Sequence, residues 1–168
     1  MYKLALPLGL IITLVDQATK YWAEQALSDG QRISVIGDFL SFTLVYNPGA
    51  AFSFGTGNTW LFTIFSIVVI AVITYVLKEC KSKPWAITLG VIVGGAMGNF
   101  IDRIFRDPSF GQGHVVDFIN YNGWFVGNVA DVALVLGVAA LIVIELKGVP
   151  FGGKQARAED EEAEPVHE

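Results

Sequence analysis

The chain has 168 residues, 53% of them hydrophobic, and a net charge of −5, so no basic surplus suggests a nucleic-acid partner. Its mean hydropathy of +0.53 is higher than a soluble domain of this length needs, which indicates a membrane protein. Six acids crowd the last ten residues. Residues 151–168 are therefore predicted to form a disordered acidic tail, and residues 1–150 a single membrane domain.

Four segments are long and apolar enough to cross a bilayer as helices, which takes about 20 mostly apolar residues. They run from about residue 4 to 22, 60 to 77, 85 to 101 and 128 to 146. Each has a tryptophan at or near one end, where an indole suits the membrane–water interface. No small-residue cleavage site follows the first segment, so it is predicted to be a retained helix and not a signal peptide.

Basic residues set the expected orientation, because cytoplasmic loops carry an excess of Lys and Arg. With the amino terminus in the cytoplasm, the inner side carries Lys3, Lys78, Lys81, Lys83, Lys147, Lys154 and Arg157, and the outer side carries Lys20, Arg32, Arg103 and Arg106. The inner side has the excess. Both termini are therefore expected to be cytoplasmic, which puts the acidic tail there too.

The first outer loop, residues 28–59, is long for a connector. Within it FLSFTLVY, residues 39–46, has β-type composition with partial alternation, and the turn-forming NPG follows. We predict a small sheet on the outer surface, with its aromatic side, including Phe42 and Tyr46, toward lipid.

Under this orientation, polar residues from several segments gather near the outer ends of the helices. Polar groups at membrane depth cost several kcal/mol unless they are paired or face a wet cavity. A cluster on one side therefore suggests a site. Its members are Asp16, Lys20, Asn47, Asn99, Asp102, Arg103, Asp117, Asn128 and Asp131.

Two of the helical patterns have both structural and functional interpretations. Asp16 and Lys20 are four residues apart, share a helix face and can form an ion pair, whether structural or part of a site. Asn99 and Arg103 form a similar row, beside a stripe of small residues at Gly90, Gly94 and Gly98 that favours close helix packing. The Arg103 guanidinium can bind a carboxylate or a substrate carbonyl, or it can serve packing.

The two remaining acids lie further along the chain. Asn128 and Asp131 have the spacing of a helix amino-terminal cap, which would also stabilise an ionised carboxylate. Asp117 lies in the apolar stretch HVVDFI and needs a partner from elsewhere in the fold. His114 is a candidate partner, although the spacing does not require it.

Several kinds of chemistry are disfavoured. The sequence has no HExxH and only two histidines, so no metal site and no cofactor is expected, and it has no GxSxG. The lone Cys80 falls on the inner side and is expected to be an inert thiol. What remains is a pair of aspartates near the outer leaflet. Two carboxylates in contact can share one proton, and one of them can then activate water while the other polarises a carbonyl.

Five motifs of the chain resemble those of a known family. DQATK, YNPGAAFSF, GGAMGNFIDR, GHVVDF and NVAD occur in the order and at the spacing of the lipoprotein signal peptidases, the bacterial type II signal peptidases, which are intramembrane aspartic proteases. These motifs span residues 16 to 131, and together they are specific. The resemblance implies an all-α membrane protein of four transmembrane helices with a small extracytoplasmic sheet that cradles the site.

The resemblance also assigns roles. It implies that Asp117 and Asp131 are the catalytic pair. It further implies that seven residues support the site or hold substrate: Asp16, Lys20, Asn47, Gly49, Asn99, Arg103 and Asn128. The substrate would be a prolipoprotein whose cysteine carries diacylglyceryl, cut on the amino side of that cysteine. The resemblance further implies a monomer in the bacterial cytoplasmic membrane, surrounded by membrane lipid, with its site on the extracytoplasmic side. Inhibition by globomycin is also expected.

Two positions depart from the family pattern. Gly127 stands where a Phe often precedes the Asn, and Val132 stands where a Ser often follows the Asp. These departures affect the expected pocket lining more than the reaction type. An alternative interpretation of the acids is a small transporter or proton relay that uses Asp16, Asp117 and Asp131. Acids on a proton path should be spread through membrane depth, whereas these cluster at one leaflet.

Overall fold

The computed structural model describes residues 1–49 and 59–152. Within them the helices are α1 (Tyr2–Ala26), α2 (Thr59–Val76), α3 (Lys83–Phe105) and α4 (Val129–Leu146). The strands are β1 (Ile33–Ile36), β2 (Leu40–Asn47), β3 (Val115–Tyr121) and β4 (Phe125–Gly127). Each predicted helical segment corresponds to one of these helices, and α1 and α3 continue about one turn beyond their predicted ends. Most of the predicted acidic tail lies outside the described residues.

Three helices of the described part are long and apolar enough to cross a membrane: α2, α3 and α4, with mean hydropathies of 2.3, 1.4 and 2.5. Many apolar side chains of α2 and α4 point outward, among them Phe65 at 66% exposure and Val135 at 68%. Outward apolar surface of this kind suits lipid. The second half of α1 carries Asp16, Lys20 and Glu24, and α1 is not among the three.

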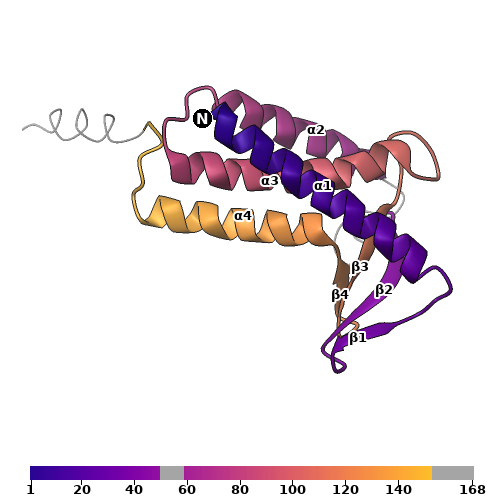
Figure 1. The fold of residues 1–168 in the computed structure, drawn as a ribbon. Coiled ribbons are helices and arrows are strands. Elements are labelled where there is room, and N and C mark those ends of the chain that lie inside the picture. Colours follow the sequence, from indigo (N-terminus) through magenta and orange to yellow (C-terminus); the bar gives the residue numbers. More distant parts are fainter. Residues whose placement is uncertain (50–58, 153–168) are drawn as a thin grey trace, which may run out of the picture.

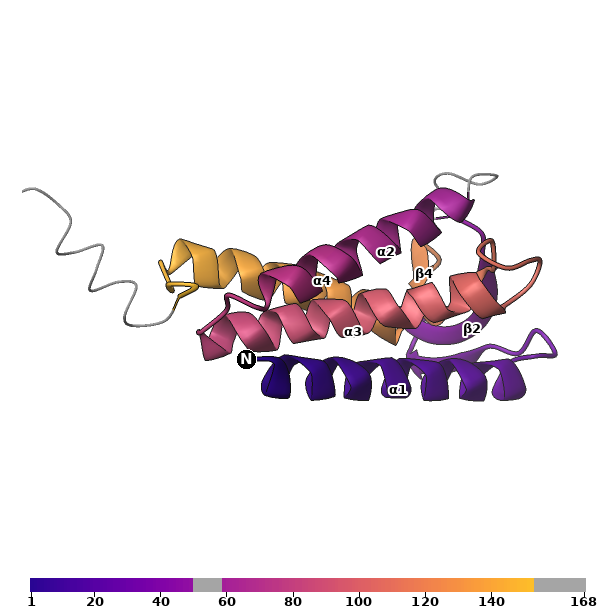
Figure 2. The ribbon, with the colours of Figure 1, turned by 90° about the horizontal axis from the view of Figure 1, so that it is seen from above.

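The central helix is α3, which packs against α1, α2 and α4 (Figure 2). The predicted stripe of small residues explains the close approach of α1. A Cβ atom added at Gly90 would lie 2.7 Å from the carbonyl oxygen of Ala5, and one added at Gly94 would lie 2.7 Å from that of Gly9. Side chains at these positions would push the two backbones apart.

The sheet lies at one end of the helices, with antiparallel strands in the order β1-β2-β3-β4 (Figure 1). The predicted strand in the first outer loop is confirmed as β2, but half of the sheet comes from the segment between α3 and α4. The expectation that Phe42 faces lipid is wrong. Its ring packs edge-on against Trp22 at 5.3 Å and contacts Phe118 at 5.9 Å, so this face of β2 covers the end of α1.

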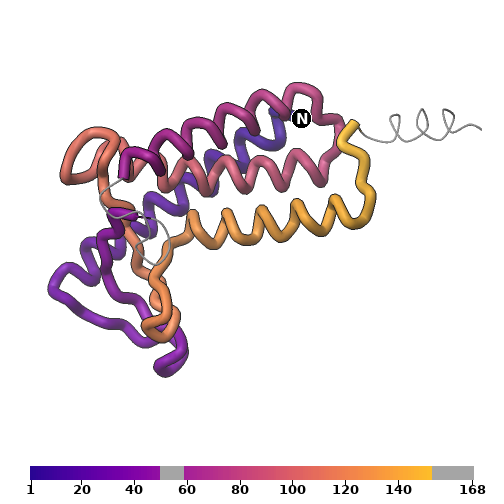
Figure 3. The backbone as a smooth tube through the Cα atoms, turned by 180° about the vertical axis from the view of Figure 1, so that it is seen from behind, coloured from indigo at the N-terminus to yellow at the C-terminus, as the bar shows by residue number. Residues whose placement is uncertain are grey.

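The end away from the sheet holds an apolar cluster. Ala5, Leu77, Cys80, Ala86 and Leu89 are all at most 5% exposed there. The amino terminus and the last turn of α4 both lie at this end, as does the connection from α2 to α3 (Figures 1 and 3). The predicted inner loops are thus on one side of the molecule and the sheet is on the other.

Candidate active site

Asp131 lies in the first turn of α4 and forms a reciprocal cap with Asn128. The side-chain oxygen of Asn128 accepts the backbone N–H of Asp131 at 2.9 Å, and Asp131 Oδ2 accepts the backbone N–H of Asn128 at 3.0 Å. The cap predicted from the sequence is confirmed. A carboxylate at this place is stabilised by the N–H groups and by the positive end of the helix dipole.

Asp117 lies in β3, and its carboxylate accepts hydrogen bonds from two side-chain amides. Asn47 Nδ2 donates to Oδ2 at 2.8 Å, and Asn128 Nδ2 donates to Oδ1 at 2.6 Å. Asn47 ends β2 and Asn128 precedes α4, so the expected partners do come from distant segments. Both of these partners are neutral amides. The candidate partner named from the sequence, His114, is not one of the two.

Asp117 and Asp131 line the same cavity, which has a volume of about 380 Å³. Only 2% of Asp117 is exposed. Burial and then the negative charge of Asp131 raise the pKa of Asp117 to about 7. A carboxyl group that keeps its proton near neutral pH can act as a general acid, and an ionised carboxylate beside it can act as a general base.

The rest of the cavity lining is mainly apolar. It comes from α2, β4 and α4, and includes Phe62, Phe65, Val69, Phe125, Leu134 and Val135. The polar groups Asn47, Asn99 and Arg103 lie in the same lining as the two aspartates. The cavity therefore combines a polar region suited to chemistry with an apolar wall that continues the membrane-facing helices.

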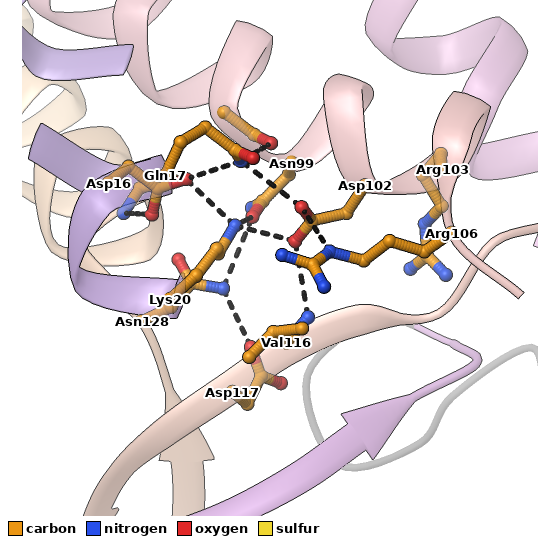
Figure 4. Close-up of polar contacts among 12 residues, drawn as sticks. Asp16, Gln17, Lys20, Asn99, Asp102, Arg103, Arg106, Val116, Asp117 and Asn128 are labelled. Carbon is orange, nitrogen blue, oxygen red and sulfur yellow. Dashed lines mark hydrogen bonds and ion pairs between the residues drawn. The ribbon is translucent and has the colours of Figure 1, made fainter. Parts of the chain in front are cut away.

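Asn99 links Lys20 of α1 to Asn128, which bonds to Asp117 (Figure 4), and it also bonds to Asp131. Lys20 Nζ donates to Asn99 Oδ1 at 3.0 Å, and Asn99 Nδ2 donates to Asp131 Oδ1 at 2.9 Å. Asn128 Nδ2 also donates to Asn99 Oδ1, at 3.1 Å. Because the Lys20 ammonium can only donate, it fixes which end of the Asn99 amide faces Asp131.

Lys20 itself is held between two carboxylates. The predicted ion pair with Asp16 is confirmed at 2.8 Å, and a second pair with Asp102 has the same length. All three side chains are fully buried. Asp16 Oδ1 also accepts the backbone N–H of Ala130 at 2.8 Å, which joins α1 to the first turn of α4.

Arg103 binds carbonyl groups of this chain. Its guanidinium donates to the backbone oxygens of Asn47 and Gly113, each at 3.1 Å, and to that of Gly49. The guanidinium also lies 5.6 Å from the centre of the Phe62 ring. The sequence left open whether Arg103 binds substrate or serves packing, and these contacts favour the structural role. Arg103 holds the end of β2, and with it Asn47, which donates to Asp117.

Sequence reasoning gave no role to three polar residues of this region: it counted Asp102 in the polar cluster only, and it did not include Gln17 or Arg106 there. Asp102 accepts from Gln17 and pairs with Arg106 and Lys20 (Figure 4). Asp102 and Arg106 are four residues apart on one helix face, and this spacing could have found their pair. The bonds from Asp102 to Lys20 and to Gln17 join two helices, and no local spacing contains them.

The departure at Gly127 has a local explanation. A Cβ atom added there would lie 2.8 Å from Cζ of Phe125 and 3.0 Å from Asp131 Oδ2. The Phe125 ring thus occupies the space beside residue 127, and it stacks on Tyr121 with centroids 5.0 Å apart. Gly127 permits that ring to line the cavity.

The fold and the site define a class: a membrane protein with apolar helices, a small sheet at one end, and two aspartates in one cavity. A family model described as signal peptidase (SPase) II matches residues 8–147. A lipoprotein signal peptidase of Mycolicibacterium smegmatis is 42% identical over 163 residues, which cover 97% of this chain and 69% of that protein. The chain belongs to the signal peptidase II family, as the motifs predicted.

Further relatives agree with this assignment. A lipoprotein signal peptidase of Bifidobacterium longum is 43% identical over 150 residues, covering 89% of this chain and 82% of that protein. A bacterial membrane enzyme solved by the in meso method at 2.3 Å resolution matches with a TM-score of 0.75 at 30% identity. That match covers 85% of this chain and 87% of the other. The membrane fold seen here is therefore also that of a solved membrane enzyme.

Proposed function

We propose that the chain is an intramembrane aspartic endopeptidase that removes signal peptides from diacylglyceryl-modified prolipoproteins. It cleaves on the amino side of the lipidated cysteine. The observation that carries this proposal is the pair Asp117 and Asp131 in one cavity, where burial and the charge of Asp131 raise the pKa of Asp117 to about 7. The curated relatives are lipoprotein signal peptidases, which supports the substrate class.

In the proposed mechanism, a water molecule between the two carboxyl groups attacks the scissile carbonyl carbon. One aspartate takes a proton from the water while the other donates its proton to the carbonyl oxygen. The roles reverse when the amine of the new amino terminus leaves. The pair titrates as a unit, so the resting proton belongs to the pair. Asn47, Asn99 and Asn128 hold the carboxylates in place throughout.

We propose that α1 is the fourth transmembrane helix and that both termini are cytoplasmic. Its first half carries outward-facing apolar side chains, with Leu10 and Leu14 each at 59% exposure, and the charged Asp16 and Lys20 of its second half are buried against α3 and α4. In this arrangement the sheet and the two aspartates face the extracytoplasmic side of the bacterial cytoplasmic membrane.

The apolar cavity wall suggests how substrate is held by a monomer. We propose that the acyl chains of the modified cysteine remain in lipid and lie against the aromatic side chains of α2, including Phe62 and Phe65. The backbone before the cysteine then extends across the polar part of the cavity. Since the cavity contains both surfaces, one chain is sufficient for binding and cleavage.

The test is cleavage of a diacylglyceryl-modified prolipoprotein peptide by purified protein in detergent without added metal. Mass spectrometry identifies the bond that is cut. We expect cleavage before the lipidated cysteine, lost by at least about 10³-fold in Asp117→Asn and in Asp131→Asn. Cleavage retained by both variants, or a folded wild type that is inert, would reject the proposal and favour the relay interpretation.

A further inference from the structure

Asp102 is a buried carboxylate with four hydrogen-bonding partners, and the sequence placed it in the outer polar cluster without giving it a role. Its Oδ2 accepts Lys20 Nζ at 2.8 Å and the backbone N–H of Val116 at 3.1 Å. Its Oδ1 accepts Arg106 Nε at 2.9 Å and Gln17 Nε2 at 3.1 Å. The Asp102 side chain is 0% exposed. Both oxygens are therefore fixed by donors from α1, from β3 and from the end of α3 (Figure 4).

The bond to Val116 is made at a particular place in the sheet. On one edge of β3, the short strand β4 pairs with Ile119, Asn120 and Tyr121. Val116 lies before this paired stretch, is 0% exposed and immediately precedes Asp117. A buried N–H without an acceptor is costly. Asp102 of α3 supplies that acceptor and holds β3 at the residue next to Asp117.

A second route leads from Asp102 to the other aspartate. Asp102 pairs with Lys20, whose ammonium also donates to Asn99, and Asn99 donates to Asp131. One carboxylate is thus linked to Asp117 through the backbone of β3 and to Asp131 through Lys20 and Asn99. These links join four elements: α1, α3, β3 and α4.

We propose that Asp102 is a positioning residue that fixes Asp117 and Asp131 relative to each other. This inference rests on the proposed function, in which the two carboxyl groups act on one water molecule. Asp102 does not line the cavity, so it acts through Val116 and Lys20. A displacement of about 1 Å at a reacting group can reduce the rate about 100-fold, which is the size of effect that positioning predicts.

The first test compares Asp102→Asn with a matched control, Glu24→Gln. Each variant neutralises a carboxylate that pairs with Arg106, but Glu24 contacts neither Val116 nor Lys20 in the bonds described above. We expect Asp102→Asn to lower kcat about 100-fold with KM within twofold of wild type. Glu24→Gln should leave kcat within twofold. If both variants lower kcat and the melting temperature in parallel, Asp102 has only a structural role and the proposal is rejected.

A second variant separates positioning from charge. Asp102→Glu keeps the negative charge that pairs with Lys20 and Arg106, so it should fold, but it moves the carboxylate by one methylene. We expect a lowered kcat together with faster hydrogen exchange at the Val116 amide, measured by NMR on labelled protein in detergent. Wild-type kcat and unchanged Val116 exchange in Asp102→Glu would overturn the proposal.

The exchange measurement also separates this inference from the proposed function. In the wild type, the Val116 amide should exchange slowly, far more slowly than the exposed turn at Asn122, whatever reaction the protein catalyses. Fast exchange at Val116 would overturn the positioning role while leaving the aspartic mechanism intact. Slow exchange in a protein that does not cleave the lipidated peptide would instead reject the proposed function.

Discussion

The two ends of the helices differ in the kind of side chain that they bury. At the end away from the sheet, the buried cluster of Ala5, Leu77, Cys80, Ala86 and Leu89 is apolar, and Trp85 extends it by packing edge-on against Phe151 at 5.3 Å. At the sheet end, Asp16, Lys20, Asp102 and Asn128 are 0% exposed. Buried ion pairs are often no more stabilising than apolar side chains of similar size. The comparison teaches that the polar end is explained by the site it supports, whereas the apolar end is explained by packing.

The strongest way to break this comparison is to remove the shared cation of the polar end. Lys20→Met leaves Asp16 and Asp102 buried without it. We expect the free energy of unfolding to fall by about 3 to 5 kcal/mol and cleavage to be lost. Chemical unfolding in detergent measures the first effect and peptide cleavage the second. Asp38→Asn, which breaks an exposed pair with Arg32 at 3.8 Å, is the control and should change neither. Unchanged stability in Lys20→Met would contradict the account.

The apolar end should respond in stability alone. Leu77 is 1% exposed and packs in the apolar cluster. Leu77→Ala removes buried apolar volume, and we expect the free energy of unfolding to fall by about 2 to 4 kcal/mol. The kcat of the folded protein, measured at a temperature well below its melting point, should stay within twofold. A kcat loss as large as that of Asp102→Asn would show that the two ends are not separable.

The pH dependence of stability sharpens the comparison further. Burial and the charge of Asp131 raise the pKa of Asp117 to about 7 from an ordinary value near 3.8. The folded state therefore keeps a proton between about pH 4 and pH 7 that the unfolded state has released. The contribution of this proton to stability is full below about pH 4 and is lost as pH rises through this window. Melting temperatures in detergent at pH 5 and pH 7.5 should differ, and Asp117→Asn should reduce the difference.

The control for this measurement is Asp29→Asn, which removes an exposed carboxylate on the same side of the molecule. It should leave the pH dependence as in the wild type. If Asp117→Asn has the same slope as the wild type, then the Asp117 carboxyl is not the group that titrates between the folded and unfolded states.

The smallest effect is expected at Cys80. The thiol is buried, and its Sγ lies 3.3 Å from the carbonyl oxygen of Ser82. Cys80→Ala removes one weak donor and little volume, so we expect a change in stability below about 1 kcal/mol and a wild-type kcat. A larger change, or inactivation of the wild type by a thiol reagent that spares the variant, would give Cys80 a role that the present account lacks.

Much of the fold and the site was predictable, because the signals were local. Apolar runs predicted the helices, the Gly90 and Gly94 stripe predicted close packing with another helix, and the Asn128 and Asp131 spacing predicted the cap. The motif order predicted the family. Each of these signals depends on residues within a few turns of one another, or on a pattern that the family shares.

What the sequence did not predict depends on contacts between distant segments. The apolar stretch HVVDFI was given no secondary structure, whereas most of it lies in β3 because the distant β2 pairs with it, for example at Val45 and Asp117. Asp102 was counted near the site but given no role, because its bonds to Lys20 and Val116 cross between elements. Phe42 was expected to face lipid, since alternation along one strand does not reveal that Trp22 covers that face.

The central claim is that Asp117 and Asp131 share one proton in the active enzyme. The most direct test is the pH dependence of kcat/KM for a lipidated peptide that has no titrating groups between pH 5 and pH 9. We predict that kcat/KM falls above about pH 7, approaching tenfold per pH unit as the pair loses its proton. A kcat/KM that stays constant from pH 6 to pH 9 would contradict the account.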